Sequence, residues 1–394
     1  MSPEELLLPR RRAALLRVLG VATGLGVAIP PLRAQGQVLR VGPRQAVRSL
    51  ASAAQHARDG MRVEVEAGDY VADVAVWPQS DLSLKAVGGR VRLIAAGASA
   101  QGKAIFVTSG ERVSIEGFDF QGTEVPDLNG AGIRLERGSL SLRDCSFSAN
   151  ECGVLTSNHP EARLRVENCE FGSILARDGK NHNLYVGRIA ELSVTGSYFH
   201  HGQLGHLLKS RAAVSHILYN RLSDEVGGRA SYELEFPNGG VAVVVGNIIQ
   251  QSAQTQNPYM VSYGSEGLGP NRHELYLINN TLVDNRPSGG IYLSVAAGPV
   301  RVRAINNLLV GNSRFASEPS WDSRANHLVD WDAFVMAARE NYALKPGSPL
   351  RGTAVDPGTG PDGQPLRPTR QYQHPRNSVA LPGPALHPGA VQLP

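Results

Sequence analysis

The chain has 394 residues, of which 42% are hydrophobic and 19% charged, with 43 glycines and 25 prolines. This globular composition excludes a collagen-like or wholly disordered chain, and three cysteines are too few for a disulfide framework. The first 34 residues carry five arginines and two glutamates, which account for +3 of the formal charge of +4, so the rest offers no basic field for nucleic acid.

The first 34 residues predict a signal peptide. Three arginines, Arg10 to Arg12, precede an apolar run from Val18 to Leu32, and Arg33 and Ala34 follow. A basic region, an apolar region and a small residue in this order are typical of export signals. The run is shorter than the roughly 20 residues of a spanning helix, so a membrane anchor is the weaker reading. We expect a periplasmic or secreted protein without a membrane span once residues 1–34 are removed.

Residues 45–59 predict a helix. Val47, Leu50, Ala54 and Ala57 fall on one helical face, and Gly60 follows as a stop signal. Because the ends of stacked β-structure expose unpaired strand groups, this helix is suited to cap the N-terminal end.

A segment of about 27 residues recurs through the middle of the chain. Its most regular copies are VSIEGFDF (113–120), LSLRDCSF (140–147), LRVENCEF (164–171) and LSVTGSYF (192–199), and looser copies continue to residue 309. Each period also holds a second short apolar segment, such as GIRL at 132 or HLLK at 206. Short strands at this spacing, without a helical pattern, predict an all-β parallel solenoid of about nine or ten coils.

One column of the repeat predicts a ladder of side chains in the interior. Toward the C-terminal end this column reads Asn220, Asn247, Asn280 and Asn307. Equivalent residues in adjacent coils lie about 4.8 Å apart, so the amides can bond from coil to coil. The same column holds Cys145 and Cys169, close enough either to form a disulfide or to remain two buried thiols.

The chain after the repeats predicts a second cap and a tail. Residues 330–340 suit a helix that begins at Asp330 as N-cap and places Trp331, Phe334, Val335 and Ala338 toward the solenoid. Of the 25 prolines, 11 follow residue 341, which favours an extended tail over a central strand. We therefore expect a β-helix over residues 35–342 and a Pro/Gly-rich tail, residues 343–394, that wraps it.

These features resemble the right-handed parallel β-helix proteins of the pectate-lyase-like superfamily. The resemblance rests on the helix followed by RVEVEAGDYV, on the Asn-bearing coils, and on NYALKPGSPLRG followed by GAVQL near the end. It implies a single-stranded right-handed parallel β-helix with an N-terminal capping helix. The same fold hosts lyases, hydrolases, epimerases, tailspikes and adhesins, so it leaves the function open.

Large polar residues concentrate between residues 178 and 263, where structural coils need only apolar, small and Asn positions. Leu184, Leu207 and Leu234 each lie 13 residues before a ladder position, and this spacing predicts that they are in register and point inward. Alternation then sends their neighbours outward. The predicted polar strip and its adjoining loops contain Asn183, His206, Glu233, Tyr185, Glu235, Lys209, Arg188, Arg211, Asn238, Asn181, His182, Tyr232 and Tyr263.

Such a strip suits an extended sugar polymer, which needs many hydrogen bonds and aromatic stacking. β-Elimination at a uronate requires a base for the C5 proton, a positive charge or metal at the carboxylate, and an acid for the leaving oxygen. HLLKSRA (206–212) followed by HILYNRLSD resembles the Lys-Ser segment of the chondroitinase B and alginate lyase family, polysaccharide lyase family six. The resemblance implies Lys209 as the base.

The rest of the catalytic set is less defined. The partner-arginine motif of that family is replaced here by LEFPNGG (234–240), which leaves the acid unassigned, with Arg211 as a substitute. Arg211 would also favour a neutral Lys209 by like-charge repulsion. The expected catalytic set is Lys209, Arg211, His206, Tyr185, Glu233 and Glu235, and the expected substrate-binding set is Asn181, His182, Asn183, Arg188, Tyr232, Asn238 and Tyr263.

Glu233 and Glu235 open two alternatives. They could hold Ca²⁺, which prefers oxygen ligands and would neutralise the substrate carboxylate. Alternatively, two residues apart on a strand, they span roughly 6.6 Å, within the about 6.5–9.5 Å of an inverting glycoside hydrolase. The Asp-Asp and Gly-His-Gly motifs of polygalacturonase-type enzymes are missing, so the hydrolase ranks second. A non-catalytic carbohydrate-binding β-helix protein is the third reading, and the sugar and the oligomeric state stay open.

Overall fold

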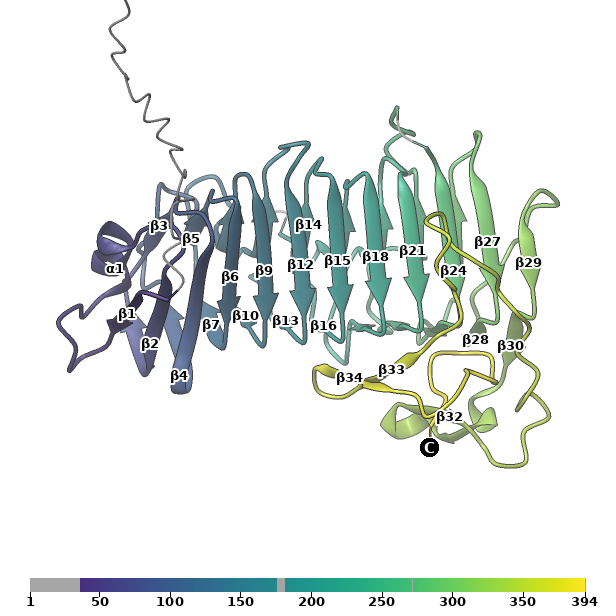
Figure 1. Cartoon of the computed structure of the whole chain (residues 1–394). Helices are drawn as coiled ribbons and strands as arrows, with labels where there is room; N and C mark the ends of the chain where they lie inside the picture. The colour runs from purple at the N-terminus through teal and green to yellow at the C-terminus, as the bar shows by residue number, and fades with distance from the viewer. Residues whose placement is uncertain (1–35, 176–180, 271, 394) are drawn as a thin grey trace, which may run out of the picture. The chain divides into compact units, whose positions relative to one another are not determined.

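The computed structural model describes residues 36–175, 181–270 and 272–393, and Ala34–Pro394 forms one compact unit. The predicted signal peptide lies outside the described residues. Short strands follow one another around each coil, and equivalent strands of successive coils pair in parallel (Figure 1). The described chain is therefore a parallel β-helix of about ten turns, as the repeat predicts.

Three faces make up the β-helix. The first face consists of β1 (Val38–Val41), β2 (Arg62–Val71), β4 (Leu82–Ile94), β6 (Arg112–Glu116), β9 (Ser139–Arg143), β12 (Arg163–Glu167), β15 (Glu191–Thr195), β18 (Val214–Leu218), β21 (Val241–Val245), β24 (Glu274–Ile278), β27 (Arg301–Ile305) and β29 (Asp322–Arg324). The second face consists of β7 (Phe118–Gln121), β10 (Ser146–Ser148), β13 (Glu170–Gly172), β16 (Tyr198–His200), β19 (Arg221–Ser223), β22 (Ile248–Gln251), β25 (Thr281–Asp284), β28 (Leu308–Val310) and β30 (His327–Val329). The third face consists of β3 (Ala75–Trp77), β5 (Ala104–Thr108), β8 (Ala131–Leu135), β11 (Cys152–Thr156), β14 (Leu184–Val186), β17 (His206–Ser210), β20 (Tyr232–Phe236), β23 (Tyr259–Tyr263) and β26 (Ile291–Val295).

Identical side chains stack along the interior. Four phenylalanine rings, Phe120, Phe147, Phe171 and Phe199, lie parallel with centroids 5.1, 4.7 and 4.6 Å apart. These rings come from the second face and fill the centre of successive coils with offset aromatic contacts.

The predicted asparagine ladder is confirmed. Asn220 Nδ2 donates to Asn247 Oδ1 at 3.0 Å, and Asn247 Nδ2 donates to Asn280 Oδ1 at 3.0 Å. The ladder continues through Asn307 to Asn326, one coil beyond the predicted column. Each amide also bonds to backbone, so these buried polar groups are paired. Further back in the same column, Cys145 and Cys169 are buried free thiols.

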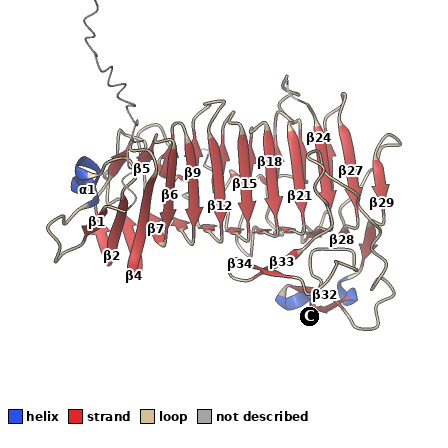
Figure 2. Ribbon diagram, in the orientation of Figure 1, coloured by secondary structure: helices blue, strands red, loops and turns tan. Residues whose placement is uncertain are grey.

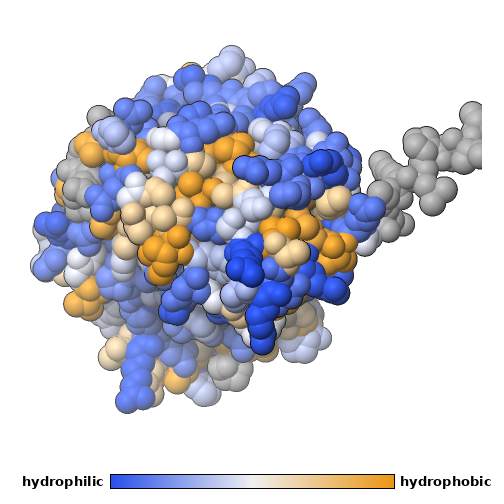
Figure 3. All heavy atoms as spheres, turned by 90° about the vertical axis from the view of Figure 1, so that its left-hand side faces the viewer, coloured by the Kyte–Doolittle hydropathy of each residue, from blue (hydrophilic) through white to orange (hydrophobic). Residues whose placement is uncertain are grey.

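The N-terminal end carries a short helix, α1 (Leu50–His56), inside the range predicted to be helical (Figure 2). Ser49 is its N-cap and accepts a hydrogen bond from the Ser52 N–H. Leu50 and Ala53 are buried in the core. Figure 3, which faces this end, shows hydrophobic patches interspersed among hydrophilic residues. Among the described residues, no helix combines the length and the apolar character needed to cross a membrane.

The helix predicted over residues 330–340 is wrong. Two 3₁₀ turns, η1 (Trp331–Ala333) and η2 (Ala337–Arg339), flank β31 (Phe334–Met336), which pairs antiparallel with β32 (Asn341–Leu344). Phe334 is buried against the Tyr342 ring, with centroids 5.4 Å apart, while Val335 is 43% exposed. The two residues point to opposite sides because the segment is extended, so they cannot share a helical face.

The proline-rich tail packs on the outside of the β-helix (Figure 1). The outer side of the second face is mostly polar up to β19, apart from Tyr198 in β16, and is apolar from β22 on. Tail residues cover both Tyr198 and this apolar part. The contacting residues are Tyr198, Ile248, Val283, Leu308 and Val310 of the second face and Phe334, Tyr342, Leu344, Tyr372 and Ala390 of the C-terminal segment.

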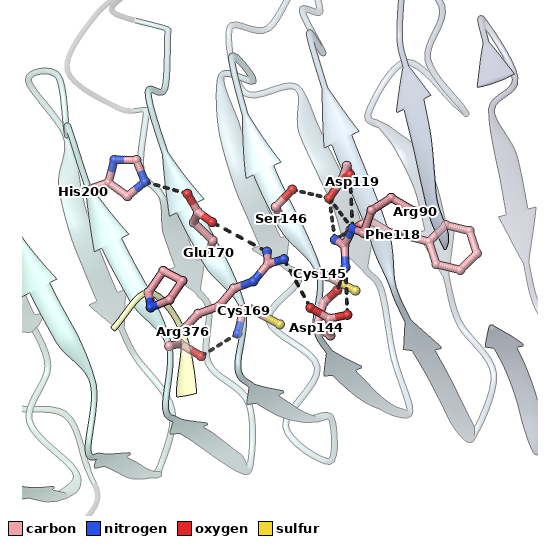
Figure 4. A network of polar contacts seen from close by, with 12 residues as sticks. Arg90, Phe118, Asp119, Asp144, Cys145, Ser146, Cys169, Glu170, His200 and Arg376 are labelled. Atoms are coloured by element: carbon pink, nitrogen blue, oxygen red, sulfur yellow. Dashed lines mark hydrogen bonds and ion pairs between the residues drawn. The ribbon is translucent and has the colours of Figure 1, made fainter. Parts of the chain in front are cut away.

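A hairpin of the tail reaches the polar coils of the second face. It consists of β33 (Arg370–Gln373) and β34 (Asn377–Ala380). Between its strands, Arg376 contacts Asp144 at 3.2 Å and Glu170 at 3.6 Å (Figure 4). Tyr198 of β16 also packs with Tyr372 and lies against the His374 ring, with centroids 5.1 Å apart, so ion pairs and aromatic contacts together hold the hairpin.

Candidate functional site

The third face carries a row of polar side chains on its outer side. Tyr185 in β14 pairs with Lys209 in β17, and Lys209 pairs with Glu235 in β20. Leu184 and Val186, on either side of Tyr185, are buried in the core, so alternation turns the row outward. Three residues predicted to be catalytic therefore lie side by side on successive coils.

The predicted register is wrong by one residue at β17. Leu208, and not Leu207, pairs with Leu184 and with Leu234. Both Leu207 and Leu208 are fully buried, because the chain turns a corner as it enters β17 and Leu207 packs beside Gly202. The turn between β17 and β18 has three residues, 211–213, whereas the equivalent turns after β14 and β20 have four, so counting 13 residues back from the ladder selected the wrong leucine.

Lys209 lies between two carboxylates. Its Nζ is 3.1 Å from Glu235 Oε2 and 2.7 Å from Glu266 Oε1. Glu266 belongs to the loop after β23 and was not among the predicted residues, because loop positions carry no signal from the repeat. The ammonium group thus forms ion pairs on two sides, and it must lose a proton before the lysine can act as a base.

Arg211 follows β17 and joins the same cluster. Its Nη2 is 2.6 Å from Glu266 Oε2, and its Nη1 donates to Asn238 Oδ1. Its Nε donates to the Tyr185 hydroxyl at 3.0 Å, and its guanidinium carbon lies 5.8 Å from the centre of the Tyr185 ring. The hydroxyl of Tyr185 accepts this bond, which leaves its own proton available.

Glu235 is held as an anion beneath this surface. Its Oε2 lies 2.9 Å from His206 Nδ1, and its Oε1 accepts a hydrogen bond from Ser265 Oγ at 2.6 Å. Burial alone would raise the pKa of Glu235, but its contacts with His206, Ser265 and Lys209 outweigh burial and lower it to about 2. Glu235 is therefore a fixed negative charge rather than a proton acceptor at neutral pH.

Three aromatic rings line the start of these strands. The His206 ring lies 4.6 Å from the His182 ring and 4.8 Å from the Tyr232 ring. His182 Nδ1 accepts from the backbone N–H of His206, and its ring stacks on Tyr185 at 5.3 Å. Burial lowers the pKa of both histidines, so both imidazoles are neutral at neutral pH.

Glu233 does not belong to this cluster. The register predicted from the three leucines also aligns Asn183, His206 and Glu233, which directly precede them, and this column does not form. His206 pairs with Tyr232 instead. Glu233 is fully buried, and its Oε1 accepts a hydrogen bond from Thr255 Oγ1 at 3.4 Å. Burial raises the pKa of Glu233 well above its usual value.

Four further predicted residues also lie outside the cluster. Asn183 is fully buried and donates to Phe171 O and His200 O, which ties one corner of the coil together. Asn181 is likewise buried and donates to Leu128 O. The prediction fails for these two because the corner, not the outer surface, receives their side chains.

Tyr263 and Arg188 lie outside the cluster for different reasons. Tyr263 points inward, is 1% exposed, packs near Phe236 and donates to Gly240 O. Ser262 takes the outward position next to Glu235. Arg188 is exposed, and its side chain has no bonded partner within the described part of the chain. In the observed register Gly187, and not Arg188, is the residue aligned with Arg211.

Glu233 and Glu235 have no partner in common, because one carboxyl lies in the interior and the other faces the cluster. A calcium site and paired-carboxylate hydrolysis both require the two groups to converge on one point. The residues present do not fit either arrangement. Nor do the described residues contain any group of three or more His, Cys, Asp or Glu side chains placed for a metal ion.

Comparison with known proteins identifies the fold. No family model and no curated protein matches the sequence. Among solved structures, the crystal structure of pectate lyase Pel9A matches with a TM-score of 0.60 at 12% sequence identity, covering 90% of this chain and 96% of that chain. The chain therefore has the parallel solenoid predicted from its repeats and the right-handed β-helix fold that the resemblance implies.

Proposed function

We propose that this chain is a polysaccharide lyase that cleaves a uronate-containing polysaccharide by β-elimination. The observation that carries the proposal is the convergence of Lys209, Arg211 and Tyr185 on the outer side of the third face. The fold is similar to that of a protein described as a pectate lyase, which is compatible with such chemistry without specifying it.

The reaction places three demands on the site. The C5 proton is removed, the C4–O bond breaks, a C4–C5 double bond forms, and the departing oxygen takes up a proton. Arg211 is the proposed partner of the uronate carboxylate, since a guanidinium binds carboxylates through two parallel N–H groups. Neutralising this carboxylate makes the adjacent C5 proton more acidic.

Lys209 is the proposed base and Tyr185 the proposed acid. C5 bears the carboxylate, so a lysine next to the carboxylate-binding arginine lies within reach of the C5 proton. Tyr185 accepts a hydrogen bond from Arg211 Nε and can donate its own proton to the leaving oxygen. His206 and Glu235 act as positioning residues, because Glu235 contacts both His206 and Lys209.

The test is incubation with a panel of uronate polymers, followed by near-ultraviolet absorbance and product mass. Elimination gives an absorbing unsaturated end, whereas hydrolysis adds one water and gives no such absorbance. We expect Lys209→Ala to abolish the absorbing product while the protein stays folded. Lys85→Ala is the matched control, because Lys85 also pairs with a carboxylate, Glu116, but lies on the first face.

Two results would contradict the proposal. New reducing ends without absorbance would indicate a hydrolase, and polymer binding without any product would indicate a carbohydrate-binding protein. We also propose that the protein is exported, on the basis of residues 1–34. Expression of the full chain and N-terminal sequencing of the exported fraction tests this, with cleavage expected near Ala34.

A further inference from the structure

Glu266 bridges the two cations of the candidate site. Its Oε1 is 2.7 Å from Lys209 Nζ, and its Oε2 is 2.6 Å from Arg211 Nη2. Each carboxylate oxygen thus faces a different cation, as in charge-assisted binding of a carboxylate ligand. The two cations thus form a binding site for a single carboxylate group, and the Glu266 side chain occupies this site in the present structure.

The second carboxylate at Lys209 is bound quite differently. Glu235 is 2% exposed and is fixed by contacts with Ser265 and His206 as well as Lys209. The Glu266 side chain is 44% exposed, and both of its ion pairs are with Lys209 and Arg211. One carboxylate is therefore part of the framework and the other is exchangeable.

Glu266 can leave without any change in the backbone. Its N–H donates to Pro237 O at 2.9 Å, and the Gly269 N–H donates to Asn238 O at 2.9 Å, so the loop is anchored to the previous coil. Rotation of the exposed side chain is enough to carry the carboxylate into water. The carboxylate of Glu266 regains water when it leaves, and an incoming carboxylate takes over the contacts with the two largely buried cations, so a competing carboxylate can displace this one.

We propose that Lys209 and Arg211 form a carboxylate subsite that Glu266 occupies in the free protein, and that the carboxylate of a bound uronate displaces Glu266. The identity of the ligand rests on the proposed function; the exchange itself rests on the geometry. Glu266 then acts as an internal competitor. When Glu266 fills the subsite, a smaller fraction of the protein molecules can bind an acidic sugar, so the observed affinity for acidic sugars is weaker. The affinity for neutral sugars is unaffected.

Glu266→Gln tests the exchange, since glutamine keeps the size of the side chain and removes its charge. Affinities are measured by calorimetric titration of the full chain with trisaccharides of galacturonate, mannuronate, guluronate and glucuronate, and with their carboxyl-reduced forms. We expect about 5-fold tighter binding of the acidic ligand by Glu266→Gln, and unchanged affinity for its reduced form. Glu161→Gln is the charge-matched control, because Glu161 is exposed and has no ion pair within the described part of the chain.

The outcomes separate this proposal from the proposed function. Tighter acidic binding without unsaturated product supports the carboxylate subsite and contradicts the lyase. Elimination by the wild type with equal or weaker acidic binding by Glu266→Gln supports the lyase and overturns the internal competitor. If no acidic ligand binds either protein, both proposals fail. Glu266→Ala repeats the test without any hydrogen-bonding group, and thermal unfolding verifies that each variant is folded.

Discussion

Asp224 and Glu233 lie together in the interior of the β-helix, joined through one hydroxyl. Thr255 Oγ1 is 3.3 Å from Asp224 Oδ2 and 3.4 Å from Glu233 Oε1. Both side chains are fully buried. Burial raises the pKa of Asp224 to about 7, and burial together with the charge of Asp224 raises the pKa of Glu233 well above its usual value, while the hydrogen bond from Thr255 offsets part of both shifts.

This pair predicts that stability falls as pH rises toward 7. The folded protein keeps protons that the unfolded chain releases near pH 4, so the stabilising contribution is complete below about pH 4 and is lost as pH rises through about 7. The expected loss is on the order of a few kcal/mol. We expect Glu233→Gln, which stays neutral, to flatten this dependence and raise the unfolding temperature at pH 8.

Thermal unfolding followed by circular dichroism from pH 4.5 to 8.5 measures the effect. Glu161→Gln, an exposed carboxylate, is the control and should keep the wild-type slope. A Glu233→Gln protein with an unchanged slope, or one that is less stable than the wild type at pH 8, would show that Glu233 is ionised in the folded state.

Tyr185→Phe tests the proposed acid. Removal of the hydroxyl leaves the ring stacked on His182 and the Arg211 guanidinium above it, so substrate binding should change little. General acid catalysis contributes about 10²- to 10⁴-fold, and we expect a fall of kcat of about 100-fold on polymer. The measurement is kcat and KM on polymer and on a uronate that carries an aryl ether at O4, because the aryl oxygen then leaves from C4 and needs no acid. Equal losses on both substrates would assign Tyr185 a structural role.

The repeat made the fold predictable, while the site was predictable only in part. A repeated interior column fixes the stacking of coils, because each ladder residue must meet its equivalent, and this gave Asn220 to Asn307 correctly. The outer surface is set by local corners instead. The turn after β17 is one residue shorter than its equivalents, which shifted the register from Leu207 to Leu208, and the corner before β20 turned Glu233 inward. Glu266 comes from a loop of irregular length, which no periodicity can place.

The ladder itself predicts a large loss of stability for Asn247→Ala. Asn247 Oδ1 accepts from the Asn220 N–H at 2.8 Å, and Asn247 Nδ2 donates to Ile217 O at 2.7 Å. Alanine leaves both backbone groups buried without these partners, at a cost of about 2–4 kcal/mol. Denaturant unfolding measures the difference. Asn285→Ala is the control, because the Asn285 side chain has no hydrogen bond within the described residues; a comparable loss in both variants would contradict the ladder's role.

Arg376→Ala is expected to loosen the tail hairpin without unfolding the coils. Arg376 contacts Asp144 at 3.2 Å and Glu170 at 3.6 Å, and Glu170 also lies 3.3 Å from His200 (Figure 4). These ion pairs are partly exposed, so their loss should cost no more than about 1 kcal/mol and move the unfolding temperature little. Tyr198 packs with Tyr372 and His374, whereas the contacts of Arg376 with Asp144 and Glu170 are ion pairs, so their loss should loosen the turn around Arg376 first. Hydrogen exchange should therefore rise selectively at residues 370–380 in Arg376→Ala. The control is Arg314→Ala, which removes an exposed arginine elsewhere and should leave exchange at residues 370–380 unchanged. Exchange that rises equally along the second face, or not at all, would show that apolar contacts of Tyr372 alone hold the tail in place.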